Sequence, residues 1–180
     1  MLVEALTPGI KIMMLEKRHA AAMLRFVDGN RGYFEKWIPF VSKNHELGEI
    51  EAFIRRLLGQ YAEGSGYFFG LWNDDAMIGF VLIKDIREDV KAAEIGYMID
   101  EKFQGRGIVK AACLRMIKFL FEERMAQKIV LCCDERNERS IALAKRLGFV
   151  LEGNLRRDSL INDEICNTLH FGLLRDEYLA

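Results

Sequence analysis

A glycine-rich turn between an apolar strand and a long amphipathic helix constrains the fold of this chain more than any other segment. The turn has the sequence Gln104-Gly-Arg-Gly-Ile-Val109. In the helix expected after it, apolar side chains recur at steps of three and four on one face, and charged side chains occupy the other. The first backbone N–H groups of a helix have no partner within it and carry partial positive charge. Strand, turn and helix together therefore form a cradle for an anion.

The two glycines make this turn accessible to a large anion. Gly105 and Gly107 carry no Cβ, so a ligand can approach the backbone closely, and Arg106 adds a fixed positive charge. A pyrophosphate suits such a site. A nucleoside triphosphate loop would end in Gly-Lys-Ser or Gly-Lys-Thr, whereas here Gly107 is followed by Ile108 and Val109. A dinucleotide-binding fold would place the turn early in the chain and add a third glycine, and this chain does neither.

Composition limits the classes of protein to which this chain can belong. The chain has 180 residues, a formal net charge of −1 and 51% hydrophobic residues, which is ordinary for one soluble domain spanning residues 1–180. The near-neutral charge argues against nucleic acid as a partner, and no apolar run approaches the ~20 residues of a membrane span. The chain shows no secretory signal and no CxxC pair, so we expect a cytoplasmic protein with reduced cysteines. The three histidines are scattered, so no metal site is expected.

The hydrophobic periodicity predicts an α/β protein. Strands are expected at Ile10–Leu15, Tyr67–Trp72, Ala76–Lys84, Ala92–Asp100, Gln127–Cys133, Phe149–Arg157 and Glu164–Leu173. Helices are expected at about residues 19–29, at Glu46–Glu63, after Gly107 and at Asn137–Leu147. The order βααβββαβαββ corresponds to a mixed sheet with helices packed on it.

Four segments in the right order identify the turn more closely than the turn does alone, since a plain tight connection would explain its glycines equally well. They are Glu94-Ile-Gly-Tyr-Met-Ile-Asp100, Gln104 to Val109, Asn137-Glu-Arg-Ser140 and Leu147-Gly-Phe149. Together they resemble the GNAT superfamily of acetyltransferases, and more closely its RimJ/RimL-like branch of ribosomal-protein N-acetyltransferases. The aromatic segment Tyr33–Phe40 resembles one that this branch carries after its first helix. The resemblance covers nearly the whole chain.

The resemblance implies the GNAT fold, in which a mixed, mostly antiparallel central sheet contains one splayed parallel strand pair and has helices on both faces. The splayed strands would be Ala92–Asp100 and Gln127–Cys133, with the co-substrate acetyl-CoA between them. Met98 and Ile99 would offer backbone groups to its pantetheine arm, as an added strand would. The pyrophosphate would lie on the backbone amides of Gln104, Gly105, Arg106, Gly107, Ile108 and Val109.

Some positions depart from the family pattern or have a second explanation. Val109 stands where the family usually has Gly or Ala, but the contact expected there is made by the backbone. Asn137 matches the family asparagine that binds the pantetheine, and Asn is also favoured as a helix N-cap. The family's usual tyrosine acid is replaced by Ala144, and the branch resemblance implies Ser140 in its place. A serine in the first turn of a helix can also be purely structural. The leaving group of the transfer is the thiolate of CoA. Because a thiol has a pKa of ~8.5, a weak acid is enough to assist its departure.

The proton acceptor and the amine pocket are expected on other segments. Glu94 begins the cofactor strand and is expected to take the amine proton directly or through water, although a solvent-facing carboxylate is an alternative. A backbone N–H of the same strand, such as that of Met98, would stabilise the oxyanion. Tyr33, Trp37 and Phe40 are expected to bind the acceptor, since aromatic side chains anchor peptides well. Packing of the first helices would also explain these aromatics.

The resemblance implies an acetyl-CoA-dependent N-acetyltransferase that acts by direct transfer to a primary amine, because no Cys-His pairing in the sequence suggests a covalent intermediate. The preferred acceptor is a protein N-terminal α-amine. A small-molecule amine acceptor (polyamine, amino acid or aminoglycoside) stays open. So does a CoA-binding sensor without turnover, which Ala144 favours and Ser140 opposes. Dimers are common in such families, so a homodimer stays open as well.

Overall fold

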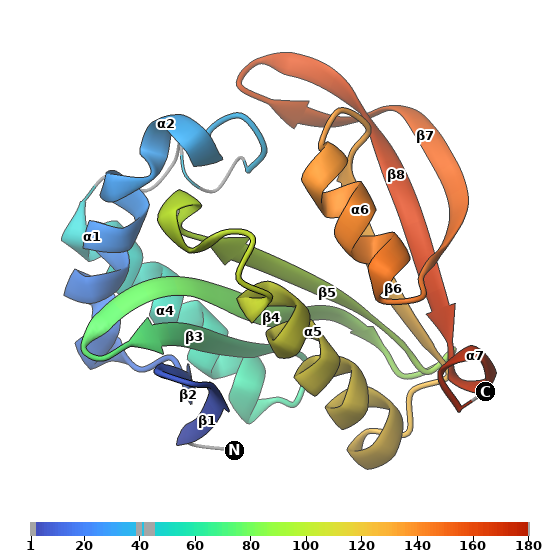
Figure 1. Ribbon diagram of the computed structural model, residues 1–180, viewed down its shortest axis with the longest axis horizontal. Coiled ribbons are helices and arrows are strands. Elements are labelled where there is room, and N and C mark those ends of the chain that lie inside the picture. The colour runs from blue at the N-terminus through green and yellow to red at the C-terminus, as the bar shows by residue number, and fades with distance from the viewer. Residues whose placement is uncertain (1–2, 39–40, 42–45, 180) are drawn as a thin grey trace.

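The computed structural model describes residues 3–38, 41 and 46–179. Phe40, one of the residues expected to bind the acceptor, lies outside this part of the chain. Within it, eight strands form one sheet in the order β1-β2-β3-β4-β5-β6-β8-β7 (Figure 1). The strands are β1 (Val3–Thr7), β2 (Ile10–Met14), β3 (Tyr67–Asn73), β4 (Ala76–Arg87), β5 (Ala92–Ile99), β6 (Lys128–Asp134), β7 (Val150–Ile161) and β8 (Glu164–Leu174). Among the strands of the described residues, only β5 and β6 pair in parallel, so the predicted sheet type is confirmed.

Helices cover both faces of this sheet (Figure 1). Buried side chains of α1 (Ala20–Gly29), α2 (Arg31–Phe34) and α4 (Leu47–Ala62) form one core with one face of the sheet. Buried side chains of α5 (Ile108–Lys118) and α6 (Glu138–Arg146) form a second core with the other face. The C-terminal α7 (Arg175–Leu179) follows β8. Among the described residues, no helix is long and apolar enough to cross a membrane.

Strand β5 contributes to both cores, because successive side chains of a strand point to opposite faces of the sheet. Ile95 is 1% exposed in the core beneath α5, and Met98 is 3% exposed in the core beneath α1 and α4. Residues of this one strand can therefore serve functions on either side of the sheet.

Each predicted strand and helix is present, with ends that move by a few residues. The elements that the sequence pattern did not predict are β1, α2 and α7, which have five, four and five residues. Elements this short show little more than one helical turn or two strand repeats, so periodicity carries almost no signal for them. Strand β7 also runs on to Ile161, four residues beyond its predicted end at Arg157.

The close approach of β4 to β5 at Gly79 leads to a stability prediction. A Cβ at this position would stand 2.5 Å from the carbonyl oxygen of Met98, which belongs to the backbone and cannot rotate away. We expect Gly79→Ala to lower the free energy of unfolding by about 1–3 kcal/mol, as overpacking does. In the control Gly153→Ala on β7, no heavy atom lies within 4 Å of the new Cβ. Urea denaturation measures both variants, and equal stability losses would contradict the steric account.

Candidate active site

The parallel pair β5–β6 is hydrogen-bonded over only part of its length. Pairing joins Ala92 to Lys128, Ala93 to Ile129 and Glu94 to Val130. Strand β5 continues to Ile99 and β6 to Asp134, and no further pairing between them occurs in this part of the described chain. Beyond Glu94 the two strands separate, and the gap opens into a cavity of about 1600 Å³.

The hydrogen-bond pattern between β4 and β5 determines which backbone groups face this gap. The N–H of Asp100 donates to the carbonyl of Ile78 at 2.8 Å. In an antiparallel ladder, pairs that exchange hydrogen bonds recur at every second residue, and the register is unbroken from Ile99 back to Glu94. The backbone groups of Met98 therefore point toward β4, whereas those of Tyr97 and Ile99 point into the gap.

The other edge of β5 shows the same alternation. The carbonyl of Lys91 accepts from the N–H of Gln127, just before β6, at 2.7 Å. The backbone N–H and C=O groups of the odd-numbered residues of β5 thus point toward β6. The backbone groups of Ile99 therefore face the gap, as expected of a partner for the cofactor. Those of Met98 face β4 instead, and it is Tyr97 whose backbone groups face the gap beside Ile99.

The glycine turn forms the far wall of the cavity. Gly105 and Gly107 both have φ of +74°, in the left-handed region that side chains with a Cβ rarely adopt. Gly107 is the N-cap of α5, and the first backbone hydrogen bond within the helix runs from the N–H of Ala111 to its carbonyl at 3.0 Å. The N–H groups of Ile108 and Val109 precede this bond and have no acceptor within the helix.

Most of the residues predicted for the site line this cavity, but Arg106 does not. Its guanidinium lies over the ring of Phe103, 4.8 Å from the ring centroid. The lining residues from the prediction are Tyr33, Trp37, Glu94, Met98, Ile99, Gln104, Gly105, Gly107, Ile108, Val109, Asn137 and Ser140. The turn therefore lines the cavity without the side chain of Arg106.

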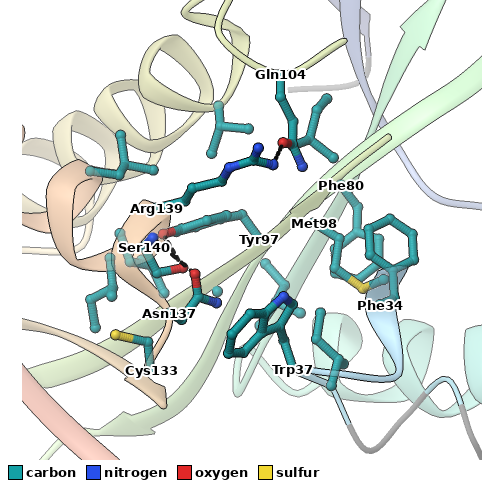
Figure 2. Close-up of a pocket in the computed structure, with 18 of the residues that line it drawn as sticks. Phe34, Trp37, Phe80, Tyr97, Met98, Gln104, Cys133, Asn137, Arg139 and Ser140 are labelled. Carbon is teal, nitrogen blue, oxygen red and sulfur yellow. Dashed lines mark hydrogen bonds between the residues drawn. The ribbon is translucent and has the colours of Figure 1, made fainter. Parts of the chain in front are cut away.

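Helix α6 brings Asn137 and Ser140 to the cavity. Asn137 is the N-cap, and its Oδ1 accepts a hydrogen bond from the N–H of Ser140 at 3.1 Å. The Oγ of Ser140 lies 3.1 Å from the hydroxyl of Tyr97 (Figure 2). Burial raises the pKa of Tyr97 well above its usual range, so its phenol is neutral. The strand period places the Tyr97 side chain on one face with Ile95 and Ile99, but no sequence signal links it to α6.

The carboxylate of Glu94 lies on the opposite face of β5 and is tied to a lysine. The Glu94 side chain is 16% exposed, and its Oε1 is 2.9 Å from the Nζ of Lys84 on β4. Burial lowers the pKa of Lys84, but the hydrogen bond and negative charge of Glu94 outweigh it and raise the pKa. Lys84 therefore keeps its positive charge beside Glu94. The sequence analysis missed this partner, although the pairing of Lys84 with Glu94 follows from the β4–β5 register.

An arginine that the sequence analysis also missed spans the cavity. Arg139 on α6 reaches across Tyr97 to the side-chain oxygen of Gln104 in the glycine turn (Figure 2). Its Nη1 also donates to the hydroxyl of Tyr33 at 3.4 Å. Arg139 thus connects α6, the glycine turn and α2 around the opening between the strands.

A cysteine that lines the cavity does have a histidine partner, which the sequence pattern did not suggest. The Sγ of Cys132 on β6 lies 3.4 Å from the Nδ1 of His170 on β8. Burial raises the pKa of Cys132 to about 12. The thiol therefore stays protonated, and a protonated thiol is a poor nucleophile.

Comparison with known proteins identifies the fold and the family. A family model described as an acetyltransferase (GNAT) domain matches residues 11–150. YdaF of Bacillus subtilis (strain 168), which is provisionally named a ribosomal N-acetyltransferase, is 30% identical over 94% of this chain and 93% of its own. The ribosomal-protein-serine acetyltransferase of Escherichia coli (strain K12) is 25% identical over 86% of this chain and 87% of its own.

A solved structure gives the same assignment of fold. The structure of RimL, a ribosomal α-N-protein acetyltransferase in complex with coenzyme A, superposes with a TM-score of 0.91. The superposition covers 97% of this chain and 99% of that one, at 20% identity. A family match over most of the chain, a relative at 30% identity and the parallel strand pair that opens beside a glycine turn agree with one another. The chain belongs to the GNAT family of acetyltransferases.

Proposed function

We propose that this enzyme transfers the acetyl group of acetyl-CoA directly to the N-terminal α-amine of a ribosomal protein. The observation that carries the proposal is the gap between β5 and β6, which presents free backbone groups of Tyr97 and Ile99 beside a helix N-terminus. The relatives named for action on ribosomal proteins support this class of acceptor. An acceptor of this kind implies a cytoplasmic enzyme. We also propose that residues 1–180 form a single acetyltransferase domain.

The residues around the gap fit acetyl-CoA. A pantetheine arm can add to the free edge of β5 as an extra strand, with the amides and carbonyls of Tyr97 and Ile99 as its partners. The pyrophosphate would lie on the backbone amides of the turn from Gln104 to Val109, where the glycines leave the backbone open. The Nδ2 of Asn137 remains for the ligand, because its Oδ1 caps α6. The coenzyme A held by RimL in the same fold supports this assignment.

Acid and base assistance would come from opposite faces of β5. Bound acetyl-CoA supplies a thioester, whose carbonyl carbon the amine attacks and whose sulfur departs. Ser140 would donate a hydrogen bond to that sulfur, and Glu94 would accept the amine proton directly or through water. The backbone N–H of Tyr97 or Ile99 faces the gap and would stabilise the oxyanion, in place of Met98.

The ion pair of Glu94 with Lys84 favours an α-amine as the acceptor. A carboxylate is intrinsically a weak base, and that of Glu94 is already held in an ion pair with Lys84. At pH 7, deprotonation costs roughly 1.4 kcal/mol for an α-amine with a pKa near 8, but over 4 kcal/mol for a lysine side chain. A weak base is enough for the first acceptor and inadequate for the second.

The wall of the cavity on the Glu94 side suits a peptide. Trp37, Phe34 and Phe80 lie together there (Figure 2), and Tyr33 also lines the cavity. Aromatic side chains of this kind supply contact area to a peptide at low entropic cost. Phe40 belongs to the same proposed subsite on sequence grounds alone.

Thiol release measured with a panel of acceptors tests the proposed reaction. The panel holds short peptides with a free N-terminus, the same peptides with a blocked N-terminus and a lysine, and polyamines. We expect acetyl-CoA-dependent thiol release with the free-N-terminus peptides and at least tenfold less with the others, because only the α-amine is readily neutral. Equal or greater release with polyamines would overturn the protein acceptor.

A pair of glycine variants tests the anion site. Gly107 and Gly9 have φ of +74° and +76°, and at both positions a Cβ would have no heavy atom within 4 Å. Gly9 lies in the β1–β2 turn, outside the cavity. Alanine at either position should lower the free energy of unfolding by the same amount, about 1–2 kcal/mol, because a residue with a Cβ is strained in the left-handed conformation.

Only Gly107→Ala should also weaken acetyl-CoA binding, by roughly tenfold, because it disturbs hydrogen bonds to a charged group. Isothermal titration calorimetry measures the affinity of both variants. Unchanged affinity in Gly107→Ala, or an equal loss in Gly9→Ala, would contradict a pyrophosphate site at this turn.

A further inference from the structure

The hydroxyl of Tyr97 occupies a position that the acetyl-transfer scheme described above does not use. It lies 3.1 Å from the Oγ of Ser140, across the gap between β5 and α6 (Figure 2). The two residues are 43 positions apart in the chain. The backbone groups of Tyr97 face the separate gap between β5 and β6, so one residue borders the proposed cofactor site and also contacts the serine.

We propose that Tyr97 is a positioning residue for Ser140, in which the phenol donates a hydrogen bond to the serine Oγ and leaves the serine hydrogen free to point at the thioester sulfur. The inference rests on the proposed acetyl transfer and on the role of Ser140 in it.

The direction of this hydrogen bond follows from the need to satisfy buried donors. A buried hydroxyl without an acceptor costs about 1–3 kcal/mol. Within the described part of the chain, Ser140 Oγ is the one hydrogen-bond partner recorded for the Tyr97 hydroxyl. If Ser140 donated to Tyr97, the phenolic hydrogen would have no acceptor. When Tyr97 donates, its own hydrogen is satisfied, and the hydrogen of Ser140, which lines the cavity, is left for a ligand.

Burial of the phenol argues against Tyr97 as the final proton donor. Burial raises the pKa of Tyr97, so a phenolate at this place would be strongly disfavoured. A full relay from Tyr97 through Ser140 to sulfur would leave that phenolate behind. The C–S bond therefore breaks with its electron pair on sulfur, and Ser140 stabilises the thiolate by a hydrogen bond. The proton lost by the amine passes to Glu94 or water, and the thiolate later takes its proton from solvent.

The Tyr97–Ser140 pair would compensate for the absence of the family's usual tyrosine acid. Ala144 on α6 is fully buried and offers no hydroxyl. A serine hydroxyl alone rotates freely among several directions. The hydrogen bond from Tyr97 restricts that rotation, and it also polarises the serine O–H, since linked hydrogen bonds strengthen one another.

A double-mutant cycle between Tyr97→Phe and Ser140→Ala tests the proposal. Assays follow thiol release from acetyl-CoA, with a peptide acceptor and with hydroxylamine, a small amine that needs no peptide pocket. The spontaneous reaction of hydroxylamine with the thioester is measured without enzyme and subtracted. We expect Tyr97→Phe to lower kcat roughly 5- to 50-fold and Ser140→Ala roughly 10- to 1000-fold, with the KM for acetyl-CoA unchanged within about twofold. In the Ser140→Ala background, Tyr97→Phe should cost no further activity. Tyr67→Phe removes a hydroxyl on β3 outside the cavity and should leave kcat unchanged.

Two results would overturn the positioning role. One is wild-type kcat in Tyr97→Phe. The other is a loss of the same size in both backgrounds, which is the signature of a merely structural effect. Inactivity of the wild-type enzyme toward peptides with full activity toward hydroxylamine would refute the proposed acceptor instead, and the cycle with hydroxylamine would still decide the role of Tyr97.

Discussion

The interruption of the β5–β6 ladder after Glu94 is the constraint on which the rest of the site depends. Each of the two strands is held along its whole length by its other neighbour, β5 by β4 and β6 by β8. Neither can turn to close the gap without breaking those ladders. Unpaired backbone groups inside a protein cost free energy unless water or a ligand satisfies them. The fold thus keeps open an edge that an extended ligand can complete.

The alternation of side chains along β5 places the proposed catalytic groups on opposite faces of the sheet. Because side chains alternate along β5, Tyr97 points toward α6 and Ser140, whereas Glu94 points to the other face, toward Lys84. In the proposed reaction, assistance to the leaving sulfur comes from one face and removal of the amine proton from the other. The glycine turn that follows β5 lines the same cavity.

Local signals in the sequence predicted most of the framework. The helix after Gly107 and the left-handed glycines of the turn follow from a strong apolar period and from residue type, and both are present. The direction in which the backbone groups of Met98 point did not follow from the sequence. Whether even- or odd-numbered residues of β5 pair with β4 depends on the register between the two strands. The contacts of Tyr97 with Ser140 and of Cys132 with His170 join residues far apart in the chain. Such pairs are set by packing, which a single sequence does not reveal.

The central claim is that the free edge of β5 receives the cofactor as an added strand. Residue-resolved amide hydrogen exchange, measured by NMR with and without coenzyme A, tests it directly. The account predicts that the amides of Tyr97 and Ile99 exchange rapidly in the free protein and become protected when coenzyme A binds, while the amide of Met98 is protected in both states. Equal protection of all three amides without ligand, or no change at Tyr97 and Ile99 on saturation with coenzyme A, would contradict it.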